Sequence, residues 1–219
     1  MKILTWNLER PKDGNPLILN KLKEVNADVL ILTETNIAIH PGSEYSCVST
    51  EILPPDFDGI KYASGENRTT VWSKYNIKEK YETYDDFTSV SAAIKVEETI
   101  LNVYGTIIGV FGGKGERFKT DLESQLLDFD KFSSGNFTCI AGDFNVMFSG
   151  FAYPSHDARN KLNSIFQKLN LINLTSQIEN NVDHIVISKD FIAGKEIKIE
   201  TWNEDKTLSD HIGICIEIR

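Results

Sequence analysis

Two short apolar runs constrain the fold of this chain more than any other feature. Residues 29–32 read Val-Leu-Ile-Leu and residues 138–141 read Thr-Cys-Ile-Ala. Neither run alternates apolar with polar side chains, as a half-exposed strand would. Each is therefore predicted to be a strand buried on both faces, which requires packed layers of structure on either side of it.

Helix-like and strand-like segments alternate with these runs along the whole chain. Asn15-Pro16 is typical of a helix start, and apolar residues recur at helical spacing in residues 116–132 and 155–169. Further strands are predicted at 2–6, 46–50, 60–64, 69–74, 90–96, 100–108, 182–188, 197–202 and 212–218. We expect one α/β domain over residues 1–219, with two sheets packed face to face and helices outside.

Composition narrows the class of protein. The 219 residues are 41% hydrophobic and 25% charged, which is ordinary for a globular protein. No apolar run approaches the roughly 18 to 20 residues that span a bilayer, and we expect a cytoplasmic protein without a membrane span. The net charge of −9 argues against a basic coat for nucleic acid. It leaves room for an enzyme that handles a polyanion through divalent cations.

The tetrapeptide Gly142-Asp143-Phe144-Asn145 directly follows the second apolar run. Residues i and i+2 of an extended chain point to the same side, so Asp143 and Asn145 are predicted to face one pocket. Gly-Asp is also a common way for any strand to end in a turn, so the tetrapeptide alone leaves both interpretations open.

Other predicted strands also begin or end in polar residues. These are Asn7, Glu34, the pair Asp183-His184 and the pair Asp210-His211. Carboxylates gathered at strand ends would repel one another unless a cation or shared protons balanced them. Glu34, Asp210 and Asn7 offer only oxygen ligands, which suit Mg²⁺, Mn²⁺ or Ca²⁺ rather than zinc.

At this point the chain resembles a known family. Its motifs occur in family order from residue 6 to residue 211: Trp6-Asn7-Leu8-Glu9, Leu32-Thr33-Glu34, Thr70-Val71-Trp72-Ser73-Lys74, Gly142-Asp143-Phe144-Asn145, Asp183-His184 and Ser209-Asp210-His211. Together they are similar to the endonuclease/exonuclease/phosphatase superfamily, which includes deoxyribonuclease I and exonuclease III-type enzymes. The resemblance implies a four-layer αββα sandwich with two mixed, largely antiparallel sheets, and hydrolysis of phosphoester bonds with Mg²⁺ or Mn²⁺.

The resemblance also implies roles around the metal. Glu34 would bind the ion, and Asn7 would lie beside it and help to hold the metal or the phosphate. Asp210 would border the metal site.

For the reaction itself, the resemblance implies four further roles. Asp143 would position or deprotonate the attacking water, and Asn145 would orient that water or steady the phosphoryl oxygens. His211 would contact the phosphate, and Asp183 would support His211 through the other ring nitrogen. His184 would point to the opposite face of its strand and be structural.

One position departs from the family pattern. Sphingomyelinase-like members would have histidine at position 107, where this chain has Ile107. We therefore assign Tyr104 as a contact to the phosphate or leaving group, with a packed core tyrosine as the alternative. Two interpretations stay open for four basic residues: they contact a substrate phosphate, or they are solvated. These residues are Lys114, Arg117, Lys119 and Arg68, and Arg68 lies on a predicted hairpin loop.

The resulting prediction is a monomeric, metal-dependent phosphodiesterase, a nuclease that cleaves DNA by in-line attack of an activated water. A phosphatase or phosphodiesterase for a small or lipid phosphoester is the alternative, and a non-catalytic binding protein on the same scaffold is a third. The residues that would select the substrate are not evident from the sequence.

Overall fold

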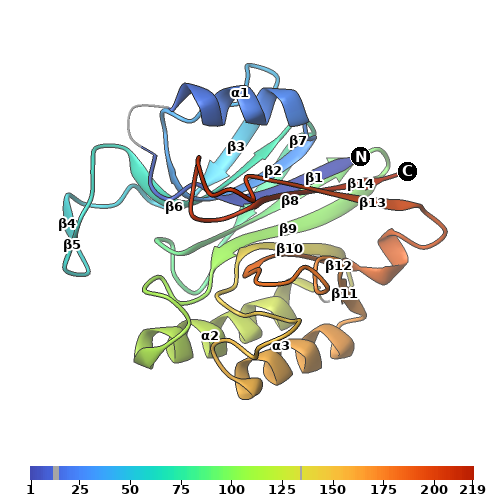
Figure 1. The fold of residues 1–219 in the computed structure, drawn as a ribbon. Helices are drawn as coiled ribbons and strands as arrows, with labels where there is room; N and C mark the ends of the chain where they lie inside the picture. Colours follow the sequence, from blue (N-terminus) through green and yellow to red (C-terminus); the bar gives the residue numbers. More distant parts are fainter. Residues whose placement is uncertain (12–14, 134) are drawn as a thin grey trace.

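The apolar runs form central strands of two sheets that pack face to face (Figure 1). The structure is a computed structural model, and it describes residues 1–11, 15–133 and 135–219. The first sheet has the order β13-β14-β1-β2-β6-β3. Its strands are β1 (Lys2–Asn7), β2 (Val29–Asn36), β3 (Ser46–Ser49), β6 (Glu66–Ser73), β13 (Ile197–Trp202) and β14 (Gly213–Ile218).

The second sheet has the order β11-β12-β10-β9-β8-β7. Its strands are β7 (Asn76–Tyr81), β8 (Ser89–Val96), β9 (Thr99–Ile107), β10 (Phe137–Asp143), β11 (Leu171–Asn173) and β12 (Asp183–Ser188). Only β1–β2 in the first sheet and β9–β10 in the second are parallel pairs among the strand pairings described. The sheets are therefore mixed and largely antiparallel, as predicted.

Helices cover the outer faces. Helix α1 (Pro16–Val25) packs on the first sheet, and its N-cap Asn15 accepts a hydrogen bond from the Leu17 N–H at 3.0 Å. Helices α2 (Gly115–Ser133) and α3 (His156–Lys168) pack on the second sheet (Figure 1). With the apolar core between the sheets, this gives the predicted four-layer αββα sandwich. A short 3₁₀ helix follows β12 at Lys189–Phe191.

Residues 56–81 differ from the predictions in several places. Arg68 lies inside β6 and is buried, whereas the sequence placed it on a hairpin loop. The hairpin of β4 (Asp56–Phe57) and β5 (Ile60–Lys61) lies before it and projects from one end of the sandwich (Figure 1). The polar edge strand β7 was not predicted, because its side chains are mostly exposed and charged, as edge strands often are.

Candidate active site

Polar strand ends from both sheets meet at one edge of the sandwich. Because β1 and β2 run parallel, Asn7 and Glu34 leave the first sheet at the same edge. In the second sheet, the register of β10 and β12 places Asp143 opposite Asp183. A hydrogen bond of 3.2 Å from Asn7 Nδ2 to Asp143 Oδ2 joins the two sheets there.

Asn7 connects the two central carboxylates. Its Nδ2 also donates to Glu34 Oε1 at 3.1 Å, while its Oδ1 accepts the Glu9 N–H at 2.9 Å. The NH₂ group of Asn7 therefore faces the carboxylates, and its oxygen is held by the turn after β1. Asn7 contributes to this site as a hydrogen-bond donor that fixes the positions of Glu34 and Asp143.

Glu34 reaches the site through an unusual backbone conformation. In β2, Leu30 and Leu32 pack toward helix α1, and strict alternation would send Glu34 to that outer face. Glu34 instead has φ of 44°, which is left-handed, and its carboxylate turns toward Asn7. Such a conformation costs on the order of 1–3 kcal/mol in a non-glycine residue and is typical of functional sites.

Asp143 and Asn145 lie together for a reason other than strand alternation. Strand β10 ends at Asp143, and Asn145 has a left-handed φ of 51°. The Asn145 backbone N–H donates to Asp143 Oδ1 at 2.9 Å, and its Nδ2 lies 3.4 Å from Asp143 Oδ2. An Asx-type turn thus brings the two side chains into one site. Nδ2 of Asn145 also donates to the Gly109 carbonyl at 3.1 Å.

Gly142 is required by this turn. It has φ of 134°, and a Cβ added there would lie 2.0 Å from the Thr106 carbonyl oxygen on the neighbouring β9. Glycine alone fits this position, so Asp143 follows a backbone that no other residue could adopt without displacing β9.

Asp183 and His211 form the second polar pair of the site. His211 Nδ1 lies 2.6 Å from Asp183 Oδ2, which leaves Nε2 on the other side of the ring. The loop before β14 is held against β1, since Ser209 Oγ donates to the Asn7 carbonyl at 2.7 Å and accepts the His211 N–H at 3.1 Å. The imidazole therefore has a fixed orientation.

Burial and neighbouring charges shift the pKa values of the ionisable groups in the site. Burial, reinforced by the charge of Asp183, raises the pKa of Asp143 to about 7. Burial likewise raises the pKa of Glu34, which the hydrogen bond from Asn7 opposes. Burial alone would lower the pKa of His211, but the charge and hydrogen bond of Asp183 raise it to about 10. At neutral pH the site therefore holds an imidazolium beside a carboxyl group that titrates near neutrality.

The acidic set fits a divalent cation. Ligand atoms of Asp143, Asp183 and His211 lie within 4.8 Å of one another, but His211 is protonated and committed to Asp183, so its ring is not a metal ligand in this state. Glu34 and Asp143 instead converge on Asn7 and keep oxygen lone pairs for a hard cation. Burial raises the pKa values of both acids because it disfavours their charged forms, and a bound cation would offset that cost.

Asp210 lies at the border of the site rather than inside it. Its side chain is exposed, its Oδ1 is 3.6 Å from His211 Nε2, and its backbone N–H donates to Glu9 Oε2 at 2.8 Å. Its negative charge is nevertheless one of the causes that raise the pKa of Glu34.

Tyr104 does not belong to the site, which corrects the prediction. Its side chain faces the helix layer, where its hydroxyl donates to Asp128 Oδ2 at 2.7 Å and contacts Ser89 Oγ at 2.9 Å. Strand alternation explains this, because Tyr104 and Ile107 lie three positions apart on β9 and so point to opposite faces. Ile107 is the residue that faces the site side, where it lines a cavity with Glu34. His184 is buried between Phe144 and Phe148, a structural role as predicted.

The sequence analysis missed a cavity of about 210 Å³ beside Glu34. Arg10, Tyr62 and Arg68 line it, together with Ile107 and other apolar residues. The only signal in the sequence was the presence of two arginines near predicted strand ends.

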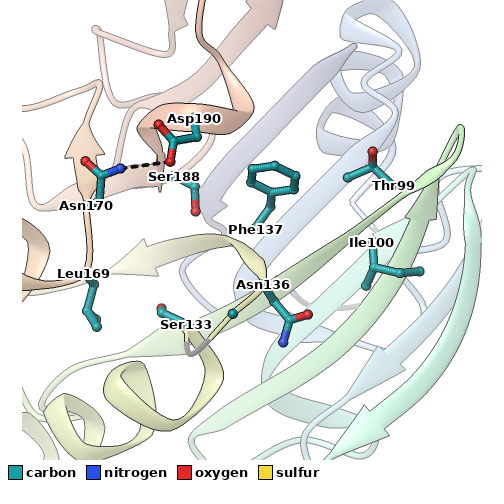
Figure 2. Close-up of a pocket in the computed structure, with 10 residues that line it drawn as sticks. Thr99, Ile100, Ser133, Asn136, Phe137, Leu169, Asn170, Ser188 and Asp190 are labelled. Carbon is teal, nitrogen blue, oxygen red and sulfur yellow. Dashed lines mark hydrogen bonds between the residues drawn. The ribbon is translucent and has the colours of Figure 1, made fainter.

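A larger pocket of about 470 Å³ lies at the opposite end of β9 and β10 (Figure 2). Thr99 and Phe137, which begin these strands, line it, whereas Asp143 ends β10. Asp190 is the charged residue among its described lining residues, and it accepts a hydrogen bond from Asn170 at 3.1 Å (Figure 2). With one carboxylate already engaged, this larger pocket lacks the groups that the strand-end site brings together.

Comparison with known proteins identifies the family of this chain. The model of the Endonuclease/Exonuclease/phosphatase family matches residues 4–211. The chain belongs to this family. The search of curated proteins found no match.

Several solved structures share the family fold over the whole chain. A 3′ phosphatase from Neisseria bound to product DNA hairpin is 15% identical with a TM-score of 0.72, and the match covers 100% of this chain and 99% of that one. An AP endonuclease from Archaeoglobus fulgidus is 15% identical with a TM-score of 0.71, again over 100% and 99%. A humanized D. rerio TDP2 is 13% identical with a TM-score of 0.65, over 100% and 98%. At these identities the likeness establishes the family fold and not the substrate.

Among the helices of residues 1–11, 15–133 and 135–219, none combines the length and apolar character of a membrane span. The cytoplasmic location stays a prediction.

Proposed function

We propose that this family member is a phosphodiesterase that uses Mg²⁺ or Mn²⁺ to cleave DNA. The observation that carries the proposal is the joining of the two sheets by Asn7, which holds Glu34 and Asp143 side by side next to the Asp183–His211 pair. The solved structures with the same fold include proteins described as a 3′ phosphatase bound to DNA and as AP endonucleases, which supports a DNA substrate.

In this proposal Glu34 holds the metal, with Asp210 at its border and Asn7 fixing the Glu34 carboxylate. The bound cation would neutralise charge on the phosphate oxygens and on the leaving alkoxide. All other steps fall to side chains of the chain itself.

Asp143 accepts a proton from the attacking water, and the Asn145 amide steadies that water or a phosphoryl oxygen. Without a metal the pKa of Asp143 is about 7, and a cation held by Glu34 beside it would favour the ionised form that accepts the proton. His211 donates through Nε2 to a phosphate oxygen as negative charge develops, and Asp183 keeps that ring protonated and oriented.

The test is a substrate panel with added metal or with chelator. Plasmid DNA, an abasic-site duplex and bis(p-nitrophenyl) phosphate should include at least one substrate that is cleaved only with Mg²⁺ or Mn²⁺. Asp143→Asn, which keeps the shape of the side chain, should abolish that cleavage while circular dichroism stays unchanged. Absence of chelator-sensitive cleavage of all three would refute the proposal.

A small or lipid phosphoester is the second candidate, favoured by the net charge of −9. Salt dependence separates the two, because contacts to several phosphates of a polymer weaken steeply as salt displaces them. A KM that rises with salt for DNA supports the nuclease. A KM that is flat in salt, together with faster turnover of a small ester, supports the alternative.

A further inference from the structure

Helix α2 holds the backbone at the end of β9 through two buried side chains. Asp121 and Gln125 lie one helical turn apart on α2, and both are fully buried. Asp121 Oδ2 accepts the Gly109 N–H at 3.1 Å, and Gln125 Nε2 donates to the Ile107 carbonyl at 3.0 Å. Side chains at i and i+4 of a helix lie on one face, so these two bind one short stretch of backbone, residues 107–109.

One peptide group in this stretch links Asp121 to Asn145. Between Ile108 and Gly109, the N–H donates to Asp121, and the carbonyl oxygen accepts Asn145 Nδ2 at 3.2 Å. The next carbonyl, that of Gly109, accepts the same Nδ2 at 3.1 Å. A carboxylate bound to the N–H of a peptide group polarises that group and makes its carbonyl a stronger acceptor. Asp121 therefore fixes the turn and strengthens an acceptor that holds Asn145.

The preceding peptide group links Gln125 to the backbone of Asp143. Its carbonyl, that of Ile107, accepts from Gln125, and the Ile108 N–H donates to the Asp143 carbonyl at 2.8 Å. Both Asp143 and Asn145 are thus connected to α2 through the end of β9.

These contacts also determine which atom Asn145 can offer to a reactant. Its Nδ2 donates to the carbonyls of Ile108 and Gly109 and lies 3.4 Å from Asp143 Oδ2. An amide nitrogen carries two hydrogens, and both are engaged by these acceptors. Among the hydrogen bonds of the described residues, none uses Asn145 Oδ1. Oδ1 is an acceptor, which suits a water molecule and not a phosphoryl oxygen.

We propose that Asp121 is a positioning residue for the hydrolysis step: through the 108–109 peptide group it holds Asn145 so that Oδ1 orients the attacking water. The inference rests on the proposed phosphodiesterase function and extends its machinery from the strand ends to the helix layer. Arg117 completes the arrangement, because its Nε donates to Asp121 Oδ1 at 2.7 Å and leaves Oδ2 for Gly109.

The test is a double-mutant cycle on turnover. With a substrate that the panel identifies, kcat and KM are measured at high enzyme concentration for the wild type, Asp121→Ala, Asn145→Ala and the double variant. Asp121→Ala should lower kcat by on the order of 10- to 100-fold, because a small displacement of an orienting group is costly, and should change KM less than about twofold. In the Asn145→Ala background it should lower kcat less than about threefold, because the group through which Asp121 acts is gone.

Asp128→Ala is the matched control. Asp128 is also buried on α2 and accepts from the Tyr104 hydroxyl at 2.7 Å and the Tyr84 N–H at 2.9 Å, and none of its described hydrogen bonds involves residues 107–109. Like Asp121→Ala, it should lower the melting temperature, but kcat should change less than about twofold. A merely structural role of Asp121 would make the two variants alike in kcat.

A second variant covers the case in which Asp121→Ala does not fold. Asp121→Asn keeps the shape of the side chain but offers Gly109 an uncharged partner, so the same pattern is expected at a smaller size. A loss of kcat that is equal in both backgrounds, or equal to that of Asp128→Ala, refutes the positioning role and leaves the phosphodiesterase standing.

If no substrate is cleaved, the proposed function fails, and NMR decides the link between Asp121 and Asn145. The same measurement decides it if Asn145→Ala has no residual turnover. The side-chain NH₂ signals of Asn145, assigned by their loss in Asn145→Ala, should shift in Asp121→Ala and stay in place in Asp128→Ala. Signals that do not shift in Asp121→Ala refute the inference.

Discussion

Replacing the buried Asp143 by asparagine should stabilise the metal-free protein in a manner that depends on pH. The folded protein raises the pKa of this carboxyl from 3.8 to about 7. The folded state therefore binds more protons than the unfolded state between these values, and stability is lost as pH rises through that window. At 1.36 kcal/mol for each change of one in pKa, the full loss is about 4 kcal/mol. Between pH 4 and pH 6.5, linkage gives about 3 kcal/mol.

Asparagine cannot ionise, so the free-energy difference between Asp143→Asn and the wild type should grow by about 3 kcal/mol over that range. Urea unfolding with chelator present, at several pH values from 4 to 6.5, measures it. Hydrogen bonds lost on substitution, such as that from Asn7, shift the difference by a constant and leave its slope. The range stops below the window in which the raised pKa of His211 contributes, from its ordinary 6.5 up to about 10.

Glu82→Gln, at an exposed position, is the control and should show no such slope. A difference for Asp143→Asn that is constant with pH would mean that the folded protein does not raise the pKa of Asp143. Asp143 would then not be a destabilised buried acid that a cation could stabilise. Repeating the series with Mg²⁺ should stabilise the wild type more than the variant, because the cation favours the ionised carboxylate.

Three other changes test the rest of the site. Glu34→Gln should weaken Mg²⁺ or Mn²⁺ activation by on the order of 10- to 100-fold, read from a metal titration of activity, and an unchanged midpoint would remove Glu34 from the metal site. Asp183→Asn should lower the turnover by about 100-fold. It should also move the alkaline limit of the pH–rate profile down from about 10 toward 6.5, because His211 loses the charge that keeps it protonated. An unmoved limit would contradict the pairing of Asp183 with His211. Gly142→Ala should destabilise the fold by several kcal/mol in urea unfolding, since its Cβ would meet the Thr106 carbonyl at 2.0 Å, and a wild-type midpoint would refute that constraint.

The layers of the fold could be predicted because buried strands show as runs of apolar residues in the sequence. The run at 29–32 is apolar on both sides, and the structure buries it between the inner core and helix α1. The exposed strand β7 could not be predicted in this way, because its charged side chains carry no burial pattern. Its place in the sheet depends on pairing with β8, as in Asn76 with Lys95, and these partners lie far apart in the chain.

The site was predictable where it depends on strand ends and was not where it depends on backbone direction. Asn7, Asp143 and Asp183 point inward as alternation along their strands requires. Tyr104 was misplaced because a shift of three positions along β9 changes the face, which a motif comparison does not register. Glu34 faces inward only because its own backbone is left-handed, which no local sequence pattern predicts. The cavity at Arg68 is formed by four segments that are distant in the chain, so no local sequence pattern could predict it.

The contacts at this edge oppose stability rather than serve it. Glu34 and Asp143 are acids whose pKa values burial raises, and Glu34 and Asn145 adopt left-handed conformations. Each of these features costs free energy that an apolar edge of the same sandwich would avoid. A sandwich that only needed to fold would not place such residues at the point where Asn7 joins its two sheets. Local choices that conflict with the rest of a well-packed fold are expected at functional sites. This physical ground supports the proposed active site at the strand-end cluster independently of family membership.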